Sequence, residues 1–146
     1  MLNRIWDKEN KYTEGLLKEY KYWVLEVSYR QHTLGCFIIF VKRKVEKISE
    51  LRNHEILELK NVMKEIQETL LKIDTFKPDR FNYFQMGNEI HNLHFHGIPR
   101  YIKPRSFMNR KWVDKTYGSV PLWLKKDVSH KLVKNLRDII KPYLEK

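Results

Sequence analysis

Hydrophobic and polar positions change their period several times along the chain, and each change predicts an element. The segment 22–29 (YWVLEVSY) is rich in β-branched and aromatic residues, which is typical of a strand. A second strand is predicted over 34–42, and the polar link 30–33 between the two segments predicts a hairpin. Because the second segment is apolar throughout, we expect it to be a central strand that is covered on both faces.

From residue 53 onward the apolar positions recur at spacings of three and four, which predicts a long amphipathic helix over 53–73. Asn53 is the predicted N-cap, with Glu55 in the first turn, and Pro78 stands beyond the end of the helix. We expect this helix to be a packing element. Its apolar stripe consists of Ile56, Leu59, Met63, Ile66 and Leu70.

Two more strands are predicted over 80–85 and 92–98, joined through a turn at 86–88. Pro99 should close the second of them, because proline cannot donate to a strand ladder. A basic loop is expected over 100–124, followed by a helix from about 129 to the end of the chain. The residues expected on the apolar side of that helix are Leu132, Val133, Leu136, Ile139 and Ile140.

A hairpin on either side of one long helix predicts an α+β fold with a mostly antiparallel sheet. A length of 146 residues predicts one domain over 1–146. The single cysteine, Cys36, excludes an intrachain disulfide framework and four-cysteine zinc sites. The N-terminal segment MLNRIWDKENK lacks an apolar signal sequence, and the longest apolar stretch, 34–41, is too short to cross a bilayer. We therefore expect a soluble, cytoplasmic protein without a membrane partner.

The net charge of +11 narrows the possible partners. It favours nucleic acid, a phosphate-rich small molecule or an anionic membrane surface, although it can also serve solubility alone. The segment 100–111 carries five of the basic residues and no acidic one: Arg100, Lys103, Arg105, Arg110 and Lys111. It is either a contact for a polyphosphate tail or RNA phosphates, or a solvated loop. Nearby Trp112, Tyr117 and Trp123 could stack on a base, or could cap the core or a dimer interface.

Polar and apolar residues alternate over 92–98, and successive side chains of a strand point to opposite faces. We expect Leu93, Phe95 and Ile98 to face the core. The other face should carry Asn92, His94 and His96. The remaining histidines are expected in turns, at helix starts or in exposed positions: His32, His54, His91 and His130.

Three interpretations of the His94–His96 pair are open at this point. The two rings could be exposed without a role, or they could be part of a metal site, which would need further ligands that the sequence does not nominate. The third interpretation is nucleophilic or acid–base catalysis.

Residues 87–101 (GNEIHNLHFHGIPRY) resemble the signature of the histidine triad (HIT) family of nucleotide hydrolases and transferases, His-φ-His-φ-His-φ-φ, where φ is apolar. The resemblance is strongest to the bacterial branch related to diadenosine polyphosphate hydrolases. It extends upstream through 34–43 and 48–51 and covers about 24–101, with the basic loop and C-terminal helix over about 102–146 outside it. The sequence departs from the pattern at three positions: Asn92 replaces the first histidine, Gly97 occupies an apolar position and Leu34 replaces a common proline.

The resemblance implies a HIT-like fold and a role for each matching residue. His94 would attack the α-phosphorus of a dinucleoside polyphosphate or similar nucleotide to form a covalent nucleotidyl-histidine. His96 would hydrogen-bond the phosphate or help to protonate the leaving group. Asn88 and Asn92 would contact phosphate oxygens or order the loop. The remaining site residues are Asn82, which matches the family's strand asparagine, Ser28 at the nucleoside end and Arg100 on the phosphates.

No cofactor is implied, and the resemblance implies a homodimer. The alternative within the same fold is a non-catalytic nucleotide- or RNA-binding protein, which the charge and Asn92 both favour. A metal-dependent hydrolase built on the same histidine pair is a third class.

Overall fold

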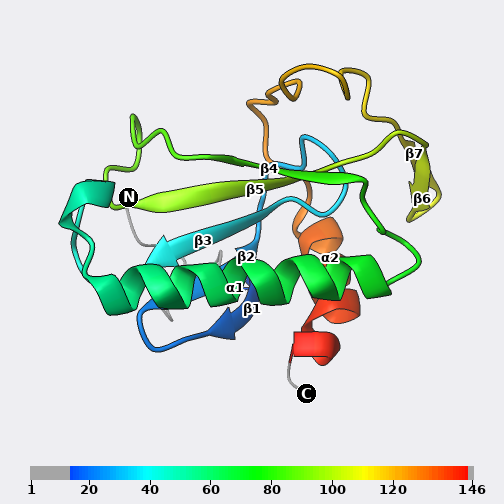
Figure 1. The fold of residues 1–146 in the computed structure, drawn as a ribbon. Coiled ribbons are helices and arrows are strands. Elements are labelled where there is room, and N and C mark those ends of the chain that lie inside the picture. Colours follow the sequence, from blue (N-terminus) through cyan, green and yellow to red (C-terminus); the bar gives the residue numbers. More distant parts are fainter. Residues whose placement is uncertain (1–13, 145–146) are drawn as a thin grey trace.

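The computed structural model describes residues 14–144, so the N-terminal segment predicted to lack a signal sequence lies outside the described residues. The main feature of the structure is a five-stranded sheet in the order β1-β2-β3-β5-β4, in which every pair of neighbours is antiparallel (Figure 1). The strands are β1 Leu16–Glu19, β2 Trp23–Val27, β3 Phe37–Val41, β4 Arg80–Phe84 and β5 His94–Arg100. The predicted α+β fold with a mostly antiparallel sheet is confirmed.

The predicted central strand is also confirmed, because β3 lies in the middle of the sheet and all five of its residues are buried. The connection before it is longer than predicted. The Gln31 side chain holds this connection, because its Oε1 accepts from the N–H of Gly35 at 2.7 Å and of Cys36 at 3.0 Å. Its Nε2 donates to the carbonyls of Ser28 at 2.8 Å and Cys36 at 2.9 Å. A side chain that satisfies four backbone groups replaces the ladder at the end of the hairpin.

The helix α1, Asn53–Lys72, lies across one face of the sheet (Figure 1). The predicted helix is confirmed, but its stripe is rotated: Ile56 is 46% exposed, whereas Glu55 and Val62 are buried. The N-cap position is Arg52 and not Asn53, and the Glu55 carboxylate accepts from the Arg52 N–H at 2.8 Å. Glu55 also receives two hydrogen bonds from Arg43, which lower the pKa of Glu55 to about 2. This ion pair lets a charged residue take an inward position.

The C-terminal helix α2, His130–Leu144, packs against β1, β2 and α1. Its predicted apolar side is confirmed, and Leu144 extends that side. Part of the predicted basic loop differs from expectation, because β6 Arg105–Phe107 and β7 Arg110–Trp112 form a separate hairpin. Phe107 and Trp112 are buried, and the tip residues Met108 and Asn109 adopt φ values of 52° and 56° that fit a tight turn. A short one-turn helix, η2 Ile48–Glu50, precedes α1.

The prediction that Pro99 closes β5 is wrong, because the strand continues to Arg100 and Pro99 pairs with Phe81 of β4. The pairing of β5 with β3 ends two residues earlier, at Gly97 opposite Phe37. The Pro99 carbonyl points to that unpaired side, where it accepts from the Thr33 hydroxyl. The missing N–H of proline therefore faces the side of β5 on which the ladder has already ended.

Gly97 leaves no gap behind the strand, because the Phe37 ring fills the space that a side chain would occupy. A Cβ placed on Gly97 would lie 2.1 Å from Phe37 Cε2. The Phe37 ring is itself buried and packs near Tyr83, with ring centroids 6.0 Å apart. The apolar side chain expected at position 97 is thus supplied by the neighbouring strand.

We therefore expect Gly97→Ala to lower the free energy of unfolding by about 1–3 kcal/mol, because the new methyl group overpacks the Phe37 contact. Urea denaturation would measure the loss. Gly118→Ala is the matched control, since a Cβ there meets nothing within 4 Å. Equal stability of the two variants would contradict this view of the core.

Candidate active site

The two histidines of β5 lie on the sheet face opposite α1. His94 pairs with Phe40 of β3 and His96 pairs with Ile38, so both side chains share one face. The intervening Phe95 and the preceding Leu93 belong to the main core on the α1 side. The predicted alternation is therefore confirmed for these four residues. Ile98 is buried, but its pairing with Asn82 puts it two residues beyond His96 on the histidine face, contrary to the prediction.

His94 is held in one ring orientation by its own strand. Its Nδ1 lies 2.8 Å from the carbonyl oxygen of Asn92, and the ring stacks on Phe40 with centroids 4.7 Å apart. Because a carbonyl can only accept, Nδ1 carries the proton and Nε2 is the unprotonated nitrogen of the neutral ring. Only 5% of the residue surface is exposed. The arrangement presents a fixed tautomer on the histidine face.

The His96 ring meets His94 edge-on, with centroids 5.0 Å apart and an interplanar angle of 74°. Burial, together with the positive charge that His94, His32 and Arg30 can carry, lowers the pKa of His96 to about 3. His96 is therefore a neutral imidazole at pH 7 in this structure. A neutral imidazole keeps one N–H donor and one acceptor nitrogen.

Asn92, which stands in place of a first histidine, orders the backbone beneath His94. Its Oδ1 accepts from the Val45 N–H at 3.0 Å, and its Nδ2 donates to the Val41 carbonyl at 3.2 Å. The residue is 2% exposed. Of its two predicted roles, the structure provides the contacts for loop ordering, and it also places the Asn92 carbonyl against His94. Asn92 lies just before β5, and both polar atoms of its side-chain amide are bonded to backbone groups.

Two other predicted site residues lie in connecting segments. Asn88 is exposed in the loop between β4 and β5, and in residues 14–144 its side chain makes no hydrogen bond to either histidine. Ser28 is buried just after β2, where its Oγ accepts from the Arg30 N–H at 3.0 Å. Ser28 thus shapes the start of the β2–β3 connection.

Arg100 and Asn82, both predicted at the substrate, meet each other in a buried network instead. Arg100 is 2% exposed and donates to both carboxylate oxygens of Asp114, at 2.7 and 3.1 Å. It also donates to Asn82 Oδ1 at 2.8 Å and to the carbonyls of Thr116 and Ser119 at 2.6 and 2.9 Å. The acid-free run 100–111 ends just before Asp114, whose carboxylate takes the first of these cations. Arg100 therefore anchors the following segment to the end of β5.

That segment brings a tryptophan to the histidine pair. The Trp123 ring lies edge-on to His96, with centroids 5.2 Å apart, and stacks on His32 at 4.0 Å. His32 Nδ1 accepts from the Leu124 N–H at 2.8 Å, and burial lowers the pKa of His32 to about 4. The sequence assigned His32 to a turn without a role. No local pattern reveals this contact, because it joins residues about ninety positions apart.

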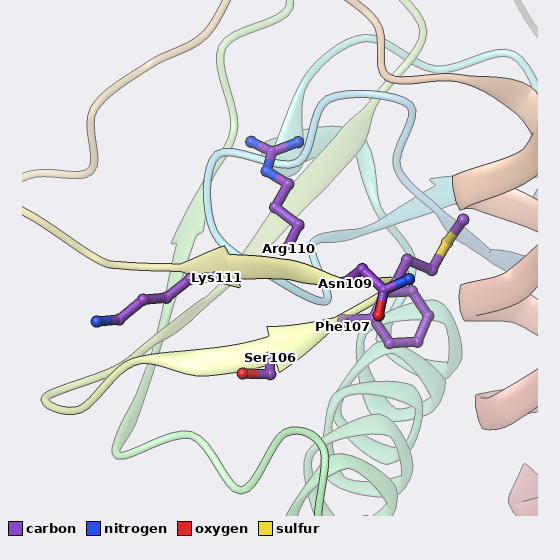
Figure 2. Close-up of a pocket in the computed structure, with 6 residues that line it drawn as sticks. Ser106, Phe107, Asn109, Arg110 and Lys111 are labelled. Atoms are coloured by element: carbon purple, nitrogen blue, oxygen red, sulfur yellow. The ribbon is translucent and has the colours of Figure 1, made fainter.

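The cationic side chains of the hairpin of β6 and β7 do not point in one direction. Arg105 is turned inward, where it donates to the carbonyls of Phe76 at 2.6 Å and Lys77 at 2.9 Å. Arg110 lies 3.8 Å over the Trp112 ring. Residues 106–111 line a shallow hollow of about 430 Å³. Figure 2 shows the Arg110 and Lys111 side chains extending in different directions. A second hollow of about 250 Å³ lies between β7 and the segment 122–124.

Within residues 14–144, no three side chains of histidine, cysteine, aspartate and glutamate come together in a group that could hold a metal ion. In the same part of the chain, no helix has both the length and the apolar character to cross a bilayer.

A protein-family model and several solved structures are similar to this chain. A sequence model described as HIT domain matches residues 19–103. A diadenosine triphosphate hydrolase from Plasmodium falciparum superposes with a TM-score of 0.66 and 14% identity, covering 90% of this chain and 77% of that chain. A hypothetical histidine triad nucleotide-binding protein from Sulfolobus tokodaii gives a TM-score of 0.66 and 20% identity, with 90% and 83% of the chains covered.

A histidine triad protein from Marinobacter aquaeolei gives a TM-score of 0.62 and 19% identity, with 91% of each chain covered. At these identities the structural likeness shows the fold alone. No curated protein matches the sequence.

Proposed function

The chain belongs to the HIT domain family, and from this premise we propose that it is a nucleotide hydrolase or nucleotidyl transferase that acts through His94. The observation that carries the proposal is the hydrogen bond from His94 Nδ1 to the Asn92 carbonyl at 2.8 Å. It fixes the ring proton on Nδ1, so that Nε2 is the unprotonated nitrogen, which is the form that a nucleophilic imidazole needs. The proposed substrate is a dinucleoside polyphosphate or a related nucleotide.

In the first step, His94 Nε2 forms a bond to the α-phosphorus while the bond from phosphorus to the leaving oxygen or nitrogen breaks. The electron pair of the broken bond departs with the leaving group. The ring then carries a positive charge, and the Nδ1–H bond to the Asn92 carbonyl stabilises that charge. In the second step, water or another acceptor attacks phosphorus and the Nε2–P bond breaks. Its electron pair returns to the ring, which becomes neutral again, and the acceptor releases its proton to solvent.

His96 is proposed to donate a hydrogen bond to the phosphate or to the leaving atom. Its pKa of about 3 makes the ring neutral before substrate binds, so it offers one N–H and not a stored proton. An anionic phosphate beside the ring would favour the imidazolium, so protonation of the leaving group requires bound substrate. Phosphoryl transfer depends mainly on positioning and charge stabilisation, and a fixed donor next to the nucleophile supplies both.

A single-turnover experiment with excess enzyme tests the proposal. Diadenosine polyphosphates and adenosine phosphoramidate would each be mixed with the protein and quenched in denaturant at alkaline pH, where phosphorus–nitrogen bonds to histidine survive. We expect a mass increase of one nucleotidyl group on the peptide that contains His94. Absence of turnover for every one of these nucleotides would contradict the enzymatic proposal.

The alternative is a nucleotide- or RNA-binding protein without turnover. It is favoured by one observation, the exposed cations of 103–111, of which Lys103, Arg110 and Lys111 face solvent. Binding that rests on many phosphate contacts weakens steeply with salt. Single-stranded RNA that binds with a steep salt dependence, together with no nucleotide turnover, would favour this alternative.

A further inference from the structure

A segment beyond the HIT domain match closes one side of the histidine pair. The family model ends at residue 103, whereas the chain from 113 to 128 folds back over the sheet and carries Trp123 to His96. Figure 1 shows this segment arching over the end of the sheet between β7 and α2. We propose that Trp123 is a positioning residue of the active site, whose indole fixes the His96 ring beside His94. This inference rests on the proposed function of the two histidines.

Three ring contacts place the indole. The Trp123 and His96 rings are nearly perpendicular, at 82°. Phe84 of β4 lies 5.7 Å away at 65°, and His32 lies 4.0 Å away at 24°. His96 is thus enclosed between His94 on its own strand and Trp123 on the separate segment. Because edge-to-face contacts set the relative orientation of two rings, the indole limits how the His96 ring can turn.

The segment that carries Trp123 is attached at both ends and beside the indole. Arg100 binds the carbonyls of Thr116 and Ser119, and the Val128 N–H donates to the Tyr29 carbonyl at 2.7 Å. Next to the indole, the Leu124 N–H donates to His32 Nδ1 at 2.8 Å. These bonds restrict the loop, and a restricted loop can hold its side chain in one position.

The same packing keeps water away from His96. Among residues 14–144, the charged and titratable groups near it are His94 on β5, and His32 and Arg30 in the β2–β3 connection. Glu26 of β2 lies on the same face across Ile38, and the remaining packed neighbours Ile38, Phe84 and Trp123 carry no charge. Loss of the indole should therefore hydrate the ring and raise its pKa toward the ordinary value.

Trp123→Ala tests the inference with two measurements. We expect kcat to fall about tenfold with little change in KM, because a displaced His96 no longer meets the reacting phosphate. We also expect the His96 imidazole, followed by NMR, to titrate at higher pH, and the acid limb of the pH–rate profile to move the same way. Trp123→Phe keeps a ring at the contact and should restore most of kcat.

Leu122→Ala is the matched control, because it shortens an exposed side chain on the same segment. His32→Ala, which removes the stacked support of the indole, should reproduce the changes if Trp123→Ala folds poorly. Equal titration and equal kcat in Trp123→Ala and Leu122→Ala would overturn the inference. Since the titration needs no turnover, a shift in Trp123→Ala supports positioning even if the wild-type protein hydrolyses no nucleotide. Absence of hydrolysis by the wild-type protein would count against the proposed function alone.

Discussion

His94→Ala should lower nucleotide turnover by at least about 10³-fold, because the proposed phosphorus–nitrogen bond forms at the His94 ring. The neighbouring His96 is on the same face, but the contact to the Asn92 carbonyl that fixes the tautomer belongs to His94. The nucleotidyl adduct should disappear together with the activity. Steady-state hydrolysis of a diadenosine polyphosphate and the trapping experiment would measure the two losses.

His91→Ala is the control for this variant, because His91 is exposed and lies only three positions before His94. It should keep wild-type turnover and the adduct. His94 is buried against Phe40, so the folding of His94→Ala must be checked by its thermal unfolding and by nucleotide binding. A folded His94→Ala protein that hydrolyses the substrate at the wild-type rate would refute the nucleophile assignment.

Arg100→Ala should lower the free energy of unfolding by about 3–5 kcal/mol, since it leaves the buried Asp114 carboxylate without its cation. The side chains of this pair are each only 2% exposed. The carbonyls of Thr116 and Ser119 lose their donor as well. Urea denaturation would measure the loss. Because Arg100 anchors the segment that carries Trp123, we also expect lower activity under conditions where the variant is folded.

Arg30→Ala offers the matched comparison for stability. It breaks the ion pair between Arg30 and Asp127, in which the Arg30 side chain is 39% exposed and the Asp127 side chain is 37% exposed. Such exposed pairs contribute at most about 1 kcal/mol. A double variant, Arg100→Met with Asp114→Leu, removes both charges and should lose less stability than Arg100→Ala. If Arg100→Ala and Arg30→Ala unfold at the same urea concentration, the buried network does not hold the segment as described.

Much of the fold could be predicted because short-range periodicity encodes it. The alternation over 92–98 put His94 and His96 on one face, and a spacing of three and four residues gave the long helix. The wrong predictions concern residues whose environment depends on a neighbouring part of the fold. Pro99 continues its strand because its N–H side faces a ladder that has ended. Glu55 faces inward because Arg43 neutralises it.

The candidate site, too, could be predicted only in part from the sequence. The residue pattern identified the histidine pair and the family resemblance, but it could not assign Arg100, which looked like a phosphate contact in an acid-free run. Asp114 follows that run by only three residues, and the pairing depends on how the chain turns after β5. Phe37 filling the space beside Gly97 likewise depends on strand register.

The sequence by itself determined four strands of the antiparallel sheet, the two helices and the shared face of His94 and His96, because each depends on the direction in which successive side chains point. The edge strand β1 was not predicted. Only the tertiary structure decided what surrounds that face. Trp123 and His32 reach it, and Arg100 holds the segment that carries Trp123, through contacts between distant parts of the chain. Such contacts are set by the path of the loops and by the burial of charge, and neither leaves a period in the sequence.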